Sequence, residues 1–588
     1  MLKRIISPLL FLAFAWFVVS NNDARTIIAG VAVFLIGMHY MENGFKLFSG
    51  GALETVLEKF TSTTPRAIGT GFLATAVVQS SSLVSVIVIS FLSAELIGLT
   101  QAVGVVFGSN IGTTATAWLV SSFGLKIKIA HYALPMLIFG VVLQFSQSNS
   151  YKGLGSVLIG LGFIFLGIAY MKEGFETLKD GLDLAEYAMA GFAGVMVYVL
   201  FGTLATVIIQ SSSATMAIII TALASGQIDY INALSLAIGA NIGTTVTAIL
   251  GALASNKNGK RLAVAHFIFN MTTGLFAIVF IYQLKELVDF LAPLLSISDK
   301  DDAMRLSLFH TIFNVIGVLL VVPFMQRLVT FLETLFCEQE QARGRAKYLT
   351  SEVMEIPATA LAALRKETIH LYDKSLETIV HAMNLHRTEI FSDAVISEVV
   401  EHSGSQIKID INQVYQQEIK SLYGEILEYA SISQANMSQE DNNEVYELKL
   451  AARRIVEMVK DVRELQKNLN YYSKSNNKFI IAKYNKLRAQ LVSVLRMIQE
   501  LRMDEDDDEE ILTRIEIQRA SLNEAEVALN HEVDVLIRER KIESHSASSL
   551  INDIGFTHSI GKKLLKCAVT LWVRDQDIKG LGDEYEYQ

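Results

Sequence analysis

A polar motif that occurs twice inside long apolar segments limits the possible folds of this chain more than any other feature. Residues 71–117 align without a gap with residues 202–248, and 21 of the 47 positions are identical. The shared core is Gln-Ser-Ser-Ser followed by Gly-x-Asn-Ile-Gly-Thr-Thr, at 79–82 with 108–114 and at 210–213 with 239–245. Such polar runs are costly in hydrocarbon unless their groups find partners or line a wet cavity. The sequence therefore predicts two related halves with polar interiors.

The charged residues divide the chain into an apolar part and a polar part. Residues 1–330 contain 18 Lys and Arg and 16 Asp and Glu, whereas residues 331–588 contain 32 and 44. We therefore expect a membrane domain over 1–330 and a soluble domain after it. The acidic second part argues against nucleic acid as a partner, because phosphate backbones attract basic surfaces. The candidate membrane segments lie near 26–41, 67–98, 100–122, 128–145, 154–171, 192–225, 231–254, 262–284 and 306–330.

A further apolar segment, residues 5–20, directly follows Lys3 and Arg4. It could be a secretory signal or a first membrane helix. The residues that follow it, Ser20-Asn21-Asn22-Asp23, make a poor cleavage site. We therefore expect a retained helix with its basic end inside.

Two of the apolar segments, 67–98 and 192–225, are too long for one membrane crossing and are polar at their middles. Duplicated halves with such interrupted segments are typical of secondary transporters. If each helix breaks there, a half-helix N-terminus presents unpaired N–H groups and a partial positive charge, which suits an anion. Serine hydroxyls can donate to anion oxygens, while Gln and Thr oxygens can coordinate Na⁺. The glycines of the Gly-x-Asn-Ile-Gly-Thr-Thr element predict a second, flexible interruption in each half.

We expect the site to be uncharged, because residues 67–122 contain only Glu95 and residues 200–255 only Asp229, both at expected loop positions. A multiply charged anion would then need bound cations, which is a physical reason for cation coupling. The alternative interpretation is structural, since single Ser and Thr residues in membrane helices usually bond the i−4 carbonyl or mediate helix packing. The equal spacing of 31 residues between Gln and Asn in both copies favours a binding site.

The two motifs resemble those of the bacterial branch of the type II sodium-dependent phosphate cotransporter family, over about residues 27–330. The resemblance implies an all-α, polytopic membrane domain of two inverted repeats with broken or re-entrant helices, in the bacterial inner membrane. The repeats would span about 27–145 and 154–284, with a closing helix over 306–330. Inorganic phosphate and Na⁺ would be the bound solutes, with Na⁺ as the coupling ion and no cofactor.

The resemblance also carries functional residues onto the matching positions of this sequence. Phosphate would bind to six serines, Ser80, Ser81, Ser82, Ser211, Ser212 and Ser213. Sodium ions would bind to oxygens of Gln79, Gln210, Thr75, Thr206, Asn110, Thr113, Asn241 and Thr244. Because both sets lie in the duplicated motifs, each half would contribute to one site between the two Gln-Ser-Ser-Ser segments.

A histidine and an asparagine four residues apart occur twice in the later segments, as His266 with Asn270 and His310 with Asn314. Residues at i and i+4 share one face of a helix. One interpretation is a proton-sensitive or cavity-lining pair, which would make transport depend on pH. The other, which we favour, is hydrogen bonding between helices that locks the bundle.

From residue 331 the sequence changes to long amphipathic segments rich in Glu, Lys and Leu. It predicts a connecting helix over 331–352 and a cytoplasmic, antiparallel helical bundle over 353–588. Residues 451–461 resemble the PhoU family, whose helical bundles accompany phosphate-transport systems. The resemblance implies metal binding by Glu457 and Asp461, whose i, i+4 spacing places both carboxylates on one helix face.

The whole sequence predicts a transporter rather than an enzyme, since it contains neither a nucleophilic triad pattern nor a P-loop that would use ATP. We expect Na⁺-coupled transport of inorganic phosphate across the lipid bilayer of the plasma membrane by alternating access. The helical domain would regulate it, through a homodimer contact or a cytoplasmic partner. Two alternatives stay open: a phosphate exporter of the same fold, and a membrane-bound phosphate-signalling or scaffold protein without transport.

Overall fold

The computed structural model describes residues 12, 14–49, 56–57, 59–125, 130–181, 189, 191–252, 256–336, 344–354, 356–403, 406–503 and 508–573. Every regular element in these ranges is a helix, which confirms the expected all-α class. The chain divides into two compact units, Met1–Glu338 and Gln339–Gln588. Half of the expected first membrane segment, residues 5–20, lies outside the described residues, and residues 14–20 are helical.

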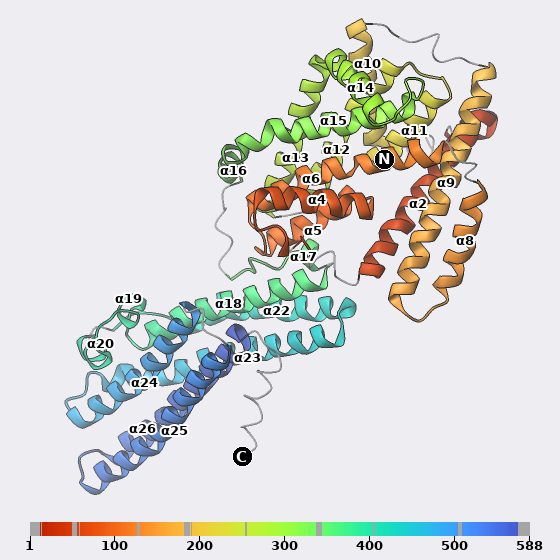
Figure 1. Ribbon diagram of the computed structural model, residues 1–588. Coiled ribbons are helices and arrows are strands. Elements are labelled where there is room, and N and C mark those ends of the chain that lie inside the picture. Colours follow the sequence, from red (N-terminus) through yellow and green to blue (C-terminus); the bar gives the residue numbers. More distant parts are fainter. Residues whose placement is uncertain are drawn as a thin grey trace. The chain divides into compact units, whose positions relative to one another are not determined.

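The first unit is built from apolar helices (Figure 1). Seven helical stretches in its described part are long and apolar enough to cross a membrane. The elements are α2 (Asn22–Ser49), α4 (Thr64–Val78), α5 (Ser81–Ser93), α6 (Leu99–Gly112), α7 (Thr114–Trp118), the π-helix η1 (Leu119–Gly124), α8 (Ala130–Gln144), α9 (Asn149–Gly181), α10 (Gly191–Ile209), α11 (Ser212–Ala224), α12 (Tyr230–Ala252), α13 (Lys257–Val279), α14 (Ile281–Leu294), α15 (Asp302–Val321), the 3₁₀ turn η3 (Val322–Phe324) and α16 (Met325–Thr334).

Both long apolar segments break at the duplicated Gln-Ser pair, as the sequence predicts. Helix α4 ends at Val78 and α5 begins at Ser81, while α10 ends at Ile209 and α11 begins at Ser212. The half-helices α5 and α11 are each 13 residues long, which is too short to span a bilayer alone. Their N-termini therefore lie within the apolar unit instead of at the end of a full crossing.

The expected second interruption in each half is wrong. Helix α12 runs without a break from Tyr230 to Ala252 through the second Gly-x-Asn-Ile-Gly-Thr-Thr element. In the first copy only Thr113 separates α6 from α7, and its φ of −59° and ψ of −25° are helical. The glycines of these elements serve close helix crossings instead: a Cβ atom at Gly108 would lie 1.9 Å from the Ile68 carbonyl oxygen, and one at Gly239 would lie 2.0 Å from that of Val199.

Helices α2 and α9 lie side by side along their length (Figure 1). Glycines spaced seven residues apart on α2, at positions 30, 37 and 44, face the backbone of α9. A Cβ atom at Gly37 would lie 2.6 Å from the Ile164 nitrogen and 2.7 Å from the Gly160 carbonyl oxygen. Small residues let membrane helices approach this closely, so that van der Waals contact and not burial from water holds the pair together.

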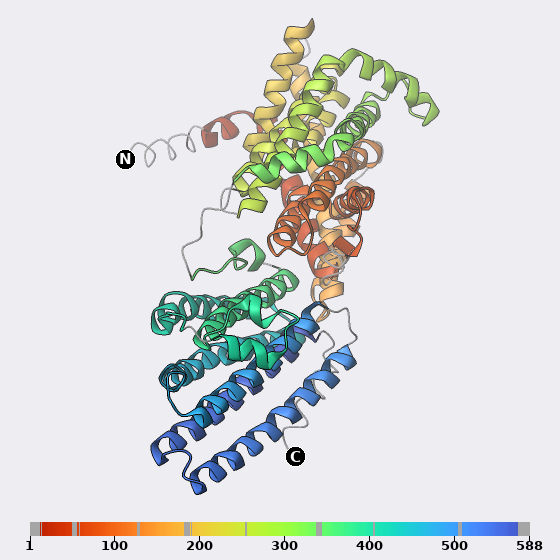
Figure 2. The ribbon, with the colours of Figure 1, turned by 90° about the vertical axis from the view of Figure 1, so that its left-hand side faces the viewer.

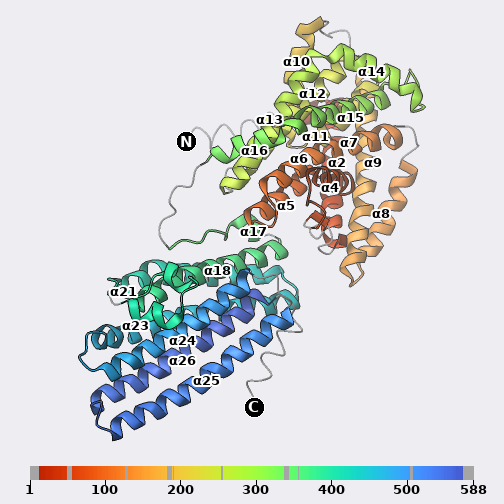
Figure 3. The same cartoon turned by 60° about the vertical axis from the view of Figure 1, so that its left-hand side comes forward.

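The second unit is a bundle of long helices with its own hydrophobic core (Figures 2 and 3). Its elements are α17 (Ser351–Met354), α18 (Pro357–Ala382), α19 (Arg387–Ile390), α20 (Ile396–His402), α21 (Ile411–Val414), the π-helix η4 (Tyr415–Ile419), α22 (Lys420–Ser433), η5 (Gln434–Asn436), α23 (Gln439–Tyr472), α24 (Lys478–Met503), α25 (Asp508–Arg538) and α26 (Ser544–Trp572). Short connections at 473–477 and 539–543 make successive long helices antiparallel, as expected.

The expected connecting helix over 331–352 is not a continuous helix. Helix α16 ends at Thr334, and residues 344–350 are non-helical before the four-residue α17 begins at Ser351. The remainder of that range, 337–343, lies outside the described residues. The division between the two units falls after Glu338, eight residues later than the expected boundary at 330.

Candidate functional site

The first break is formed by Gln79 in a left-handed conformation. Its φ is 59°, and its backbone N–H donates to the Thr75 carbonyl oxygen at 2.8 Å, which closes the end of α4. Ser80 then caps α5, because its Oγ accepts a hydrogen bond from the Leu83 nitrogen at 3.2 Å. The chain therefore stops one helix and starts the next within two residues.

The second break repeats this geometry. Gln210 has a φ of 60°, its N–H donates to the Thr206 carbonyl oxygen at 2.8 Å, and Ser211 accepts from the Ala214 nitrogen at 3.2 Å. Each break therefore presents a capped helix N-terminus with its partial positive charge. That local structure suits an anion, which is the chemistry expected from the sequence.

The remaining serines of the two motifs open the half-helices. Ser81 and Ser82 are the first two residues of α5, and Ser82 is exposed. Ser212 and Ser213 are the first two residues of α11, and both are buried. The two copies therefore differ in exposure although their backbones agree.

A threonine joins the two breaks. Thr116 on α7 donates to Gln79 Oε1 at 2.8 Å, and its Oγ1 lies 3.3 Å from Ser213 Oγ at the second break. All three side chains are buried. The two Gln-Ser-Ser-Ser segments, 131 positions apart in the sequence, thus meet through one hydroxyl group.

The expected sodium ligands fall into separate contacts. Thr75 donates to Ser109 Oγ at 2.8 Å, and Thr206 donates to Thr215 Oγ1 at 3.1 Å, each just before a break. Thr113 donates to a backbone carbonyl of its own helix. Thr75 and Thr206 therefore line the breaks, whereas Thr113 makes a local helix contact.

The two motif asparagines contact the His/Asn pairs. Asn110 Oδ1 lies 3.1 Å from His266 Nε2, and the Asn241 amide lies between the amides of Asn270 and Asn314. These contacts link α6 with α13 and α12 with α13 and α15. They agree with the favoured interpretation of the His/Asn pairs as hydrogen-bonding groups between helices.

The expectation of an uncharged site is wrong at one position. Ser80 Oγ donates to Glu42 Oε2 of α2 at 3.3 Å, and Lys46 lies 3.9 Å from the other carboxylate oxygen. The segments that carry the motifs have no charged group at the breaks, whereas α2 brings a carboxylate from outside them.

A cavity of about 390 Å³ opens beside α7. It is lined by Phe72, Thr114, Ala115, Trp118, Leu119, Ser122 and Thr311. Trp118 donates from Nε1 to Thr311 Oγ1 at 2.9 Å, so this wall joins α7 to α15. Thr116 itself does not line this cavity.

The carboxylates expected to bind a metal are paired with cationic side chains. Lys563 Nζ lies 2.6 Å from Asp461 Oδ2 and 4.0 Å from Glu457 Oε2, and Arg453 bonds Glu457 at 2.9 Å. Within the described part of the chain, no group of three His, Cys, Asp or Glu side chains could hold a metal ion. Metal binding here stays a prediction, and Lys563 supplies the neutralising charge in the structure.

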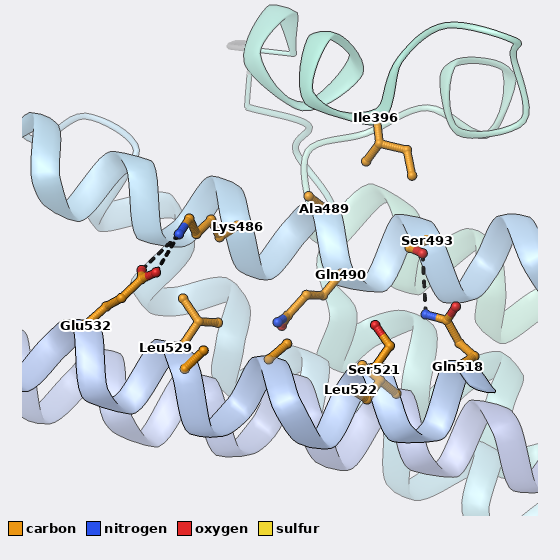
Figure 4. A pocket seen from close by; sticks show the side chains of 12 residues that line it. Ile396, Lys486, Ala489, Gln490, Ser493, Gln518, Ser521, Leu522, Leu529 and Glu532 are labelled. Atoms are coloured by element: carbon orange, nitrogen blue, oxygen red, sulfur yellow. Dashed lines mark hydrogen bonds and ion pairs between the residues drawn. The ribbon is translucent and has the colours of Figure 1, made fainter. Parts of the chain in front are cut away.

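A second cavity, of about 380 Å³, lies between α24 and α25 in the second unit (Figure 4). Lys486 bonds both carboxylate oxygens of Glu532, at 2.8 and 2.9 Å, and Gln518 donates to Ser493 Oγ at 3.4 Å. These paired groups bridge the two helices. The charge of Lys486, which lines the cavity, is neutralised by the Glu532 carboxylate.

Several residues of the site were not among the expected ligands. Thr116 lies within the repeated segment, so the duplication itself could have indicated it. Glu42 and the amides of Asn270 and Asn314 come from outside the repeated 47 residues, and only the fold brings them to the motifs.

Comparison with known protein families finds one family, described as Na⁺/Pi-cotransporter, which matches residues 33–173 and 184–298. Each matched range contains one Gln-Ser-Ser-Ser motif. Both ranges lie within the first unit, so the family match leaves the second unit, and its resemblance to PhoU, as a prediction. No solved structure matches the chain.

Curated relatives are distant. "Putative inorganic phosphate export protein YjbB" of Escherichia coli K12 is 26% identical over 362 residues, and the match spans 61% of this chain but only 64% of that protein. The protein of the same name in Salmonella typhimurium is 28% identical over 441 residues, or 73% and 79% of the two chains. "Sodium-dependent phosphate transport protein 2B" of Homo sapiens is 42% identical over 78 residues, which are 13% of this chain and 11% of that protein.

Proposed function

We propose that the first unit, in which residues 33–173 and 184–298 match the Na⁺/Pi-cotransporter family, is a multi-pass membrane transporter that carries inorganic phosphate out of a bacterial cell across the cytoplasmic membrane. The contact from Gln79 through Thr116 to Ser213 is the observation that carries the proposal. A solute bound at that contact touches both repeats, which is what alternating access between two inverted repeats needs.

Phosphate would sit between the N-termini of α5 and α11. The two half-helices supply partial positive charge, and their six serines supply hydroxyl donors to phosphate oxygens. Because residues 67–122 and 200–255 contain no Lys or Arg, a bound phosphate needs cations beside it. Sodium ions at the oxygens of Gln79, Gln210, Thr75 and Thr206 would balance that charge and couple phosphate movement to a sodium gradient.

The direction of transport follows the names of the bacterial relatives, which are given as phosphate export proteins. A carrier without an ATP site runs in either direction, and the ion and phosphate gradients decide which. Na⁺-coupled uptake is therefore the second candidate, favoured by the family description and by the segment shared with the human sodium-dependent phosphate transport protein. In either case the second unit would act as a cytoplasmic regulatory domain.

The test is phosphate flux through the purified full-length protein in liposomes. Vesicles loaded with radiolabelled phosphate should lose it faster with the protein than without it, and faster in sodium chloride than in choline chloride. Gln79→Ala and Gln210→Ala should each slow the efflux. Ser93→Ala, a buried serine at the far end of α5, is the matched control and should transport like the wild type.

The possible results separate the candidates. Flux that does not depend on Na⁺ would refute the coupling while leaving phosphate transport in place. Phosphate flux that follows an inward sodium gradient in every condition tested would favour uptake. A folded protein that moves no phosphate in either direction would leave only the signalling or scaffold function.

A further inference from the structure

Glu42 lies on α2, outside the repeated segments, yet its carboxylate reaches the first break. Ser80 Oγ donates to Glu42 Oε2 at 3.3 Å. Among the described residues, Glu42 is the one carboxylate that bonds a serine of either Gln-Ser-Ser-Ser motif. A negative charge favours a bare helix N-terminus, but it repels an anion that binds there. The position of Glu42 at a proposed anion site therefore needs a chemical explanation.

Both contacts of this carboxylate are loose. The 3.3 Å bond from Ser80 is longer than the usual range of about 2.5–3.0 Å between two oxygen atoms. Lys46 Nζ lies 3.9 Å from Oε1, which makes an ion pair too long for a hydrogen bond. An ionised carboxylate only accepts hydrogen bonds, and 31% of this side chain is exposed. Glu42 therefore has the capacity and the access to accept a further, shorter hydrogen bond.

The hydroxyl group of Ser80 is engaged in both directions. Its oxygen accepts from the Leu83 nitrogen at 3.2 Å, and its single proton points to Glu42. While this bond is in place, Ser80 has no proton to donate to an anion. An anion that carries its own proton removes the conflict, because its O–H group donates to Glu42 and the Ser80 proton turns to one of its oxygens. The exchange gains a hydrogen bond and leaves no group without a partner.

A proton is what distinguishes phosphate from other tetrahedral anions of similar size. Near neutral pH, phosphate and arsenate each keep at least one proton, whereas sulfate has none. An unprotonated oxygen placed against Glu42 brings two negative groups together with no donor between them, which disfavours that anion. A site built to bond a hydroxyl group can reject an analogue that lacks it by roughly 10⁴-fold.

We propose that Glu42 is a specificity-determining residue, which accepts a hydrogen bond from the hydroxyl group of a protonated tetrahedral oxoanion at the first break. It thereby excludes unprotonated anions of the same size and charge. Ser80 serves as the exchange partner, bonding Glu42 before the anion binds and the anion afterwards. The inference rests on the proposed function, because it requires that the anion binds at the motif serines.

The test is competition with the flux of radiolabelled phosphate through the full-length protein in liposomes, near neutral pH. The competitors are arsenate, sulfate and monofluorophosphate. Monofluorophosphate decides the matter, since it is a tetrahedral dianion like monohydrogen phosphate but has fluorine in place of the hydroxyl group. Arsenate should inhibit at about the same concentration as unlabelled phosphate. Sulfate and monofluorophosphate should need concentrations at least about a hundredfold higher.

Glu42→Gln should weaken this discrimination. The amide has nearly the shape of the carboxylate, but it carries no charge and offers an N–H donor to an unprotonated oxygen. Sulfate and monofluorophosphate should therefore inhibit the variant at concentrations roughly tenfold or more below those for the wild type. Glu42→Asp keeps a carboxylate and should retain the wild-type order of the anions.

Glu176→Gln is the matched control for the loss of a carboxylate. Glu176 on α9 has a similar lysine neighbour, with Lys172 Nζ at 3.8 Å from its Oε1, but no printed bond joins it to a motif serine. The same substitution there should leave the wild-type selectivity unchanged. Inhibition of the wild type by monofluorophosphate as strong as by arsenate would overturn the proposal, and so would wild-type selectivity in Glu42→Gln.

Thermal stability of the purified proteins in detergent measures anion binding without flux. Phosphate and arsenate should raise the unfolding temperature of the wild type, and monofluorophosphate should do so only in Glu42→Gln. If Glu42 merely stabilises the N-terminus of α5, Glu42→Gln would lower the unfolding temperature without anions and keep the wild-type ratios between anions, which would also overturn the proposal.

The two measurements together separate this inference from the proposed function. Selective binding of protonated anions without phosphate flux would refute transport and leave the role of Glu42 in place. Phosphate flux that all the competitors inhibit equally would refute the role of Glu42 and leave transport intact. A protein that neither binds nor moves any of these anions would refute both.

Discussion

Thr116 is the residue on which the joining of the two breaks depends. Thr116→Val keeps the shape of the side chain but removes the hydroxyl that contacts Gln79 and Ser213. A buried acceptor left without its donor costs about 1–3 kcal/mol, so we expect phosphate flux to fall roughly five- to 150-fold while the protein stays folded. Thr247→Val is the matched control, because Thr247 donates to the Thr244 carbonyl of its own helix, and it should transport normally. Equal flux in both variants would show that the contact has no part in transport.

The contact of Thr116 with Ser213 also shows where prediction from sequence ends. The helix breaks could be predicted because their cause is local: a polar Gln-Ser pair interrupts an apolar run. The contact could not, since its partners are 97 residues apart and only the packing of α7 against α11 brings them together. For the same reason Glu42 was absent from the predicted site.

Asp553 makes the second unit sensitive to pH. Burial raises the pKa of its carboxyl group to about 6, although hydrogen bonds from Tyr484 at 2.6 Å and Asn468 at 3.3 Å act in the opposite direction. Because the pKa is higher in the folded chain than the ordinary value of 3.8, the folded chain binds more protons between these values. The contribution of Asp553 to stability is therefore fully present below about pH 4, is lost as the pH rises through about 6, and amounts to roughly 3 kcal/mol.

Asp553→Asn removes this titration and provides the reference for its measurement. Hydrogen exchange of the α26 backbone amides should be slower in the wild type than in Asp553→Asn at the same pH. This extra protection should decrease between pH 4 and pH 6. The comparison at equal pH cancels the pH dependence of exchange itself. A constant difference between the two proteins across this range would contradict the prediction.

At the scale of elements, glycines determine how closely the membrane helices approach. The motif glycines are compatible in sequence with flexible points as well as with tight helix crossings, because glycine occurs in both. The structure separates these roles: Gln79 and Gln210, not glycines, adopt the left-handed conformation at the breaks, while Gly108 and Gly239 lie against a neighbouring backbone. The residue type alone does not reveal what faces it.

Gly37→Leu tests the close packing of α2 against α9. Its Cβ atom would lie 2.6 Å from the Ile164 nitrogen, and a backbone atom cannot move aside as a flexible side chain can. We expect the helices to separate and the unfolding temperature in detergent to fall, by the equivalent of about 1–3 kcal/mol or more. Gly69→Ala is the control, since a Cβ atom there meets nothing within 4 Å, and it should be neutral or slightly stabilising. A Gly37→Leu protein as stable as the control would mean that α2 and α9 do not pack at this glycine.

The whole molecule consists of two units that are stabilised in different ways. The core of the first unit, from Phe34 to Phe313, is formed by its own residues, and the core of the second, from Ala360 to Val573, is likewise self-contained. The first core packs apolar helices in lipid, where small residues and buried polar contacts give specificity. The second is an amphipathic bundle that depends on the exclusion of water. Each unit therefore has the means to fold without the other.

A chain that ends after Glu338 should accordingly keep the transport site intact. We expect it to insert into membranes and to unfold at the temperature at which the first unit of the full chain unfolds, since independent domains retain their own stability. It should catalyse phosphate flux within about threefold of the full-length rate. What it should lose is any response of that flux to cytoplasmic conditions, because the proposed regulatory unit is gone. Size-exclusion chromatography in detergent and flux in liposomes measure the two outcomes. Aggregation of the shortened chain would show that the second unit is needed for folding, whereas unchanged regulation would show that control of the flux resides in the membrane helices themselves.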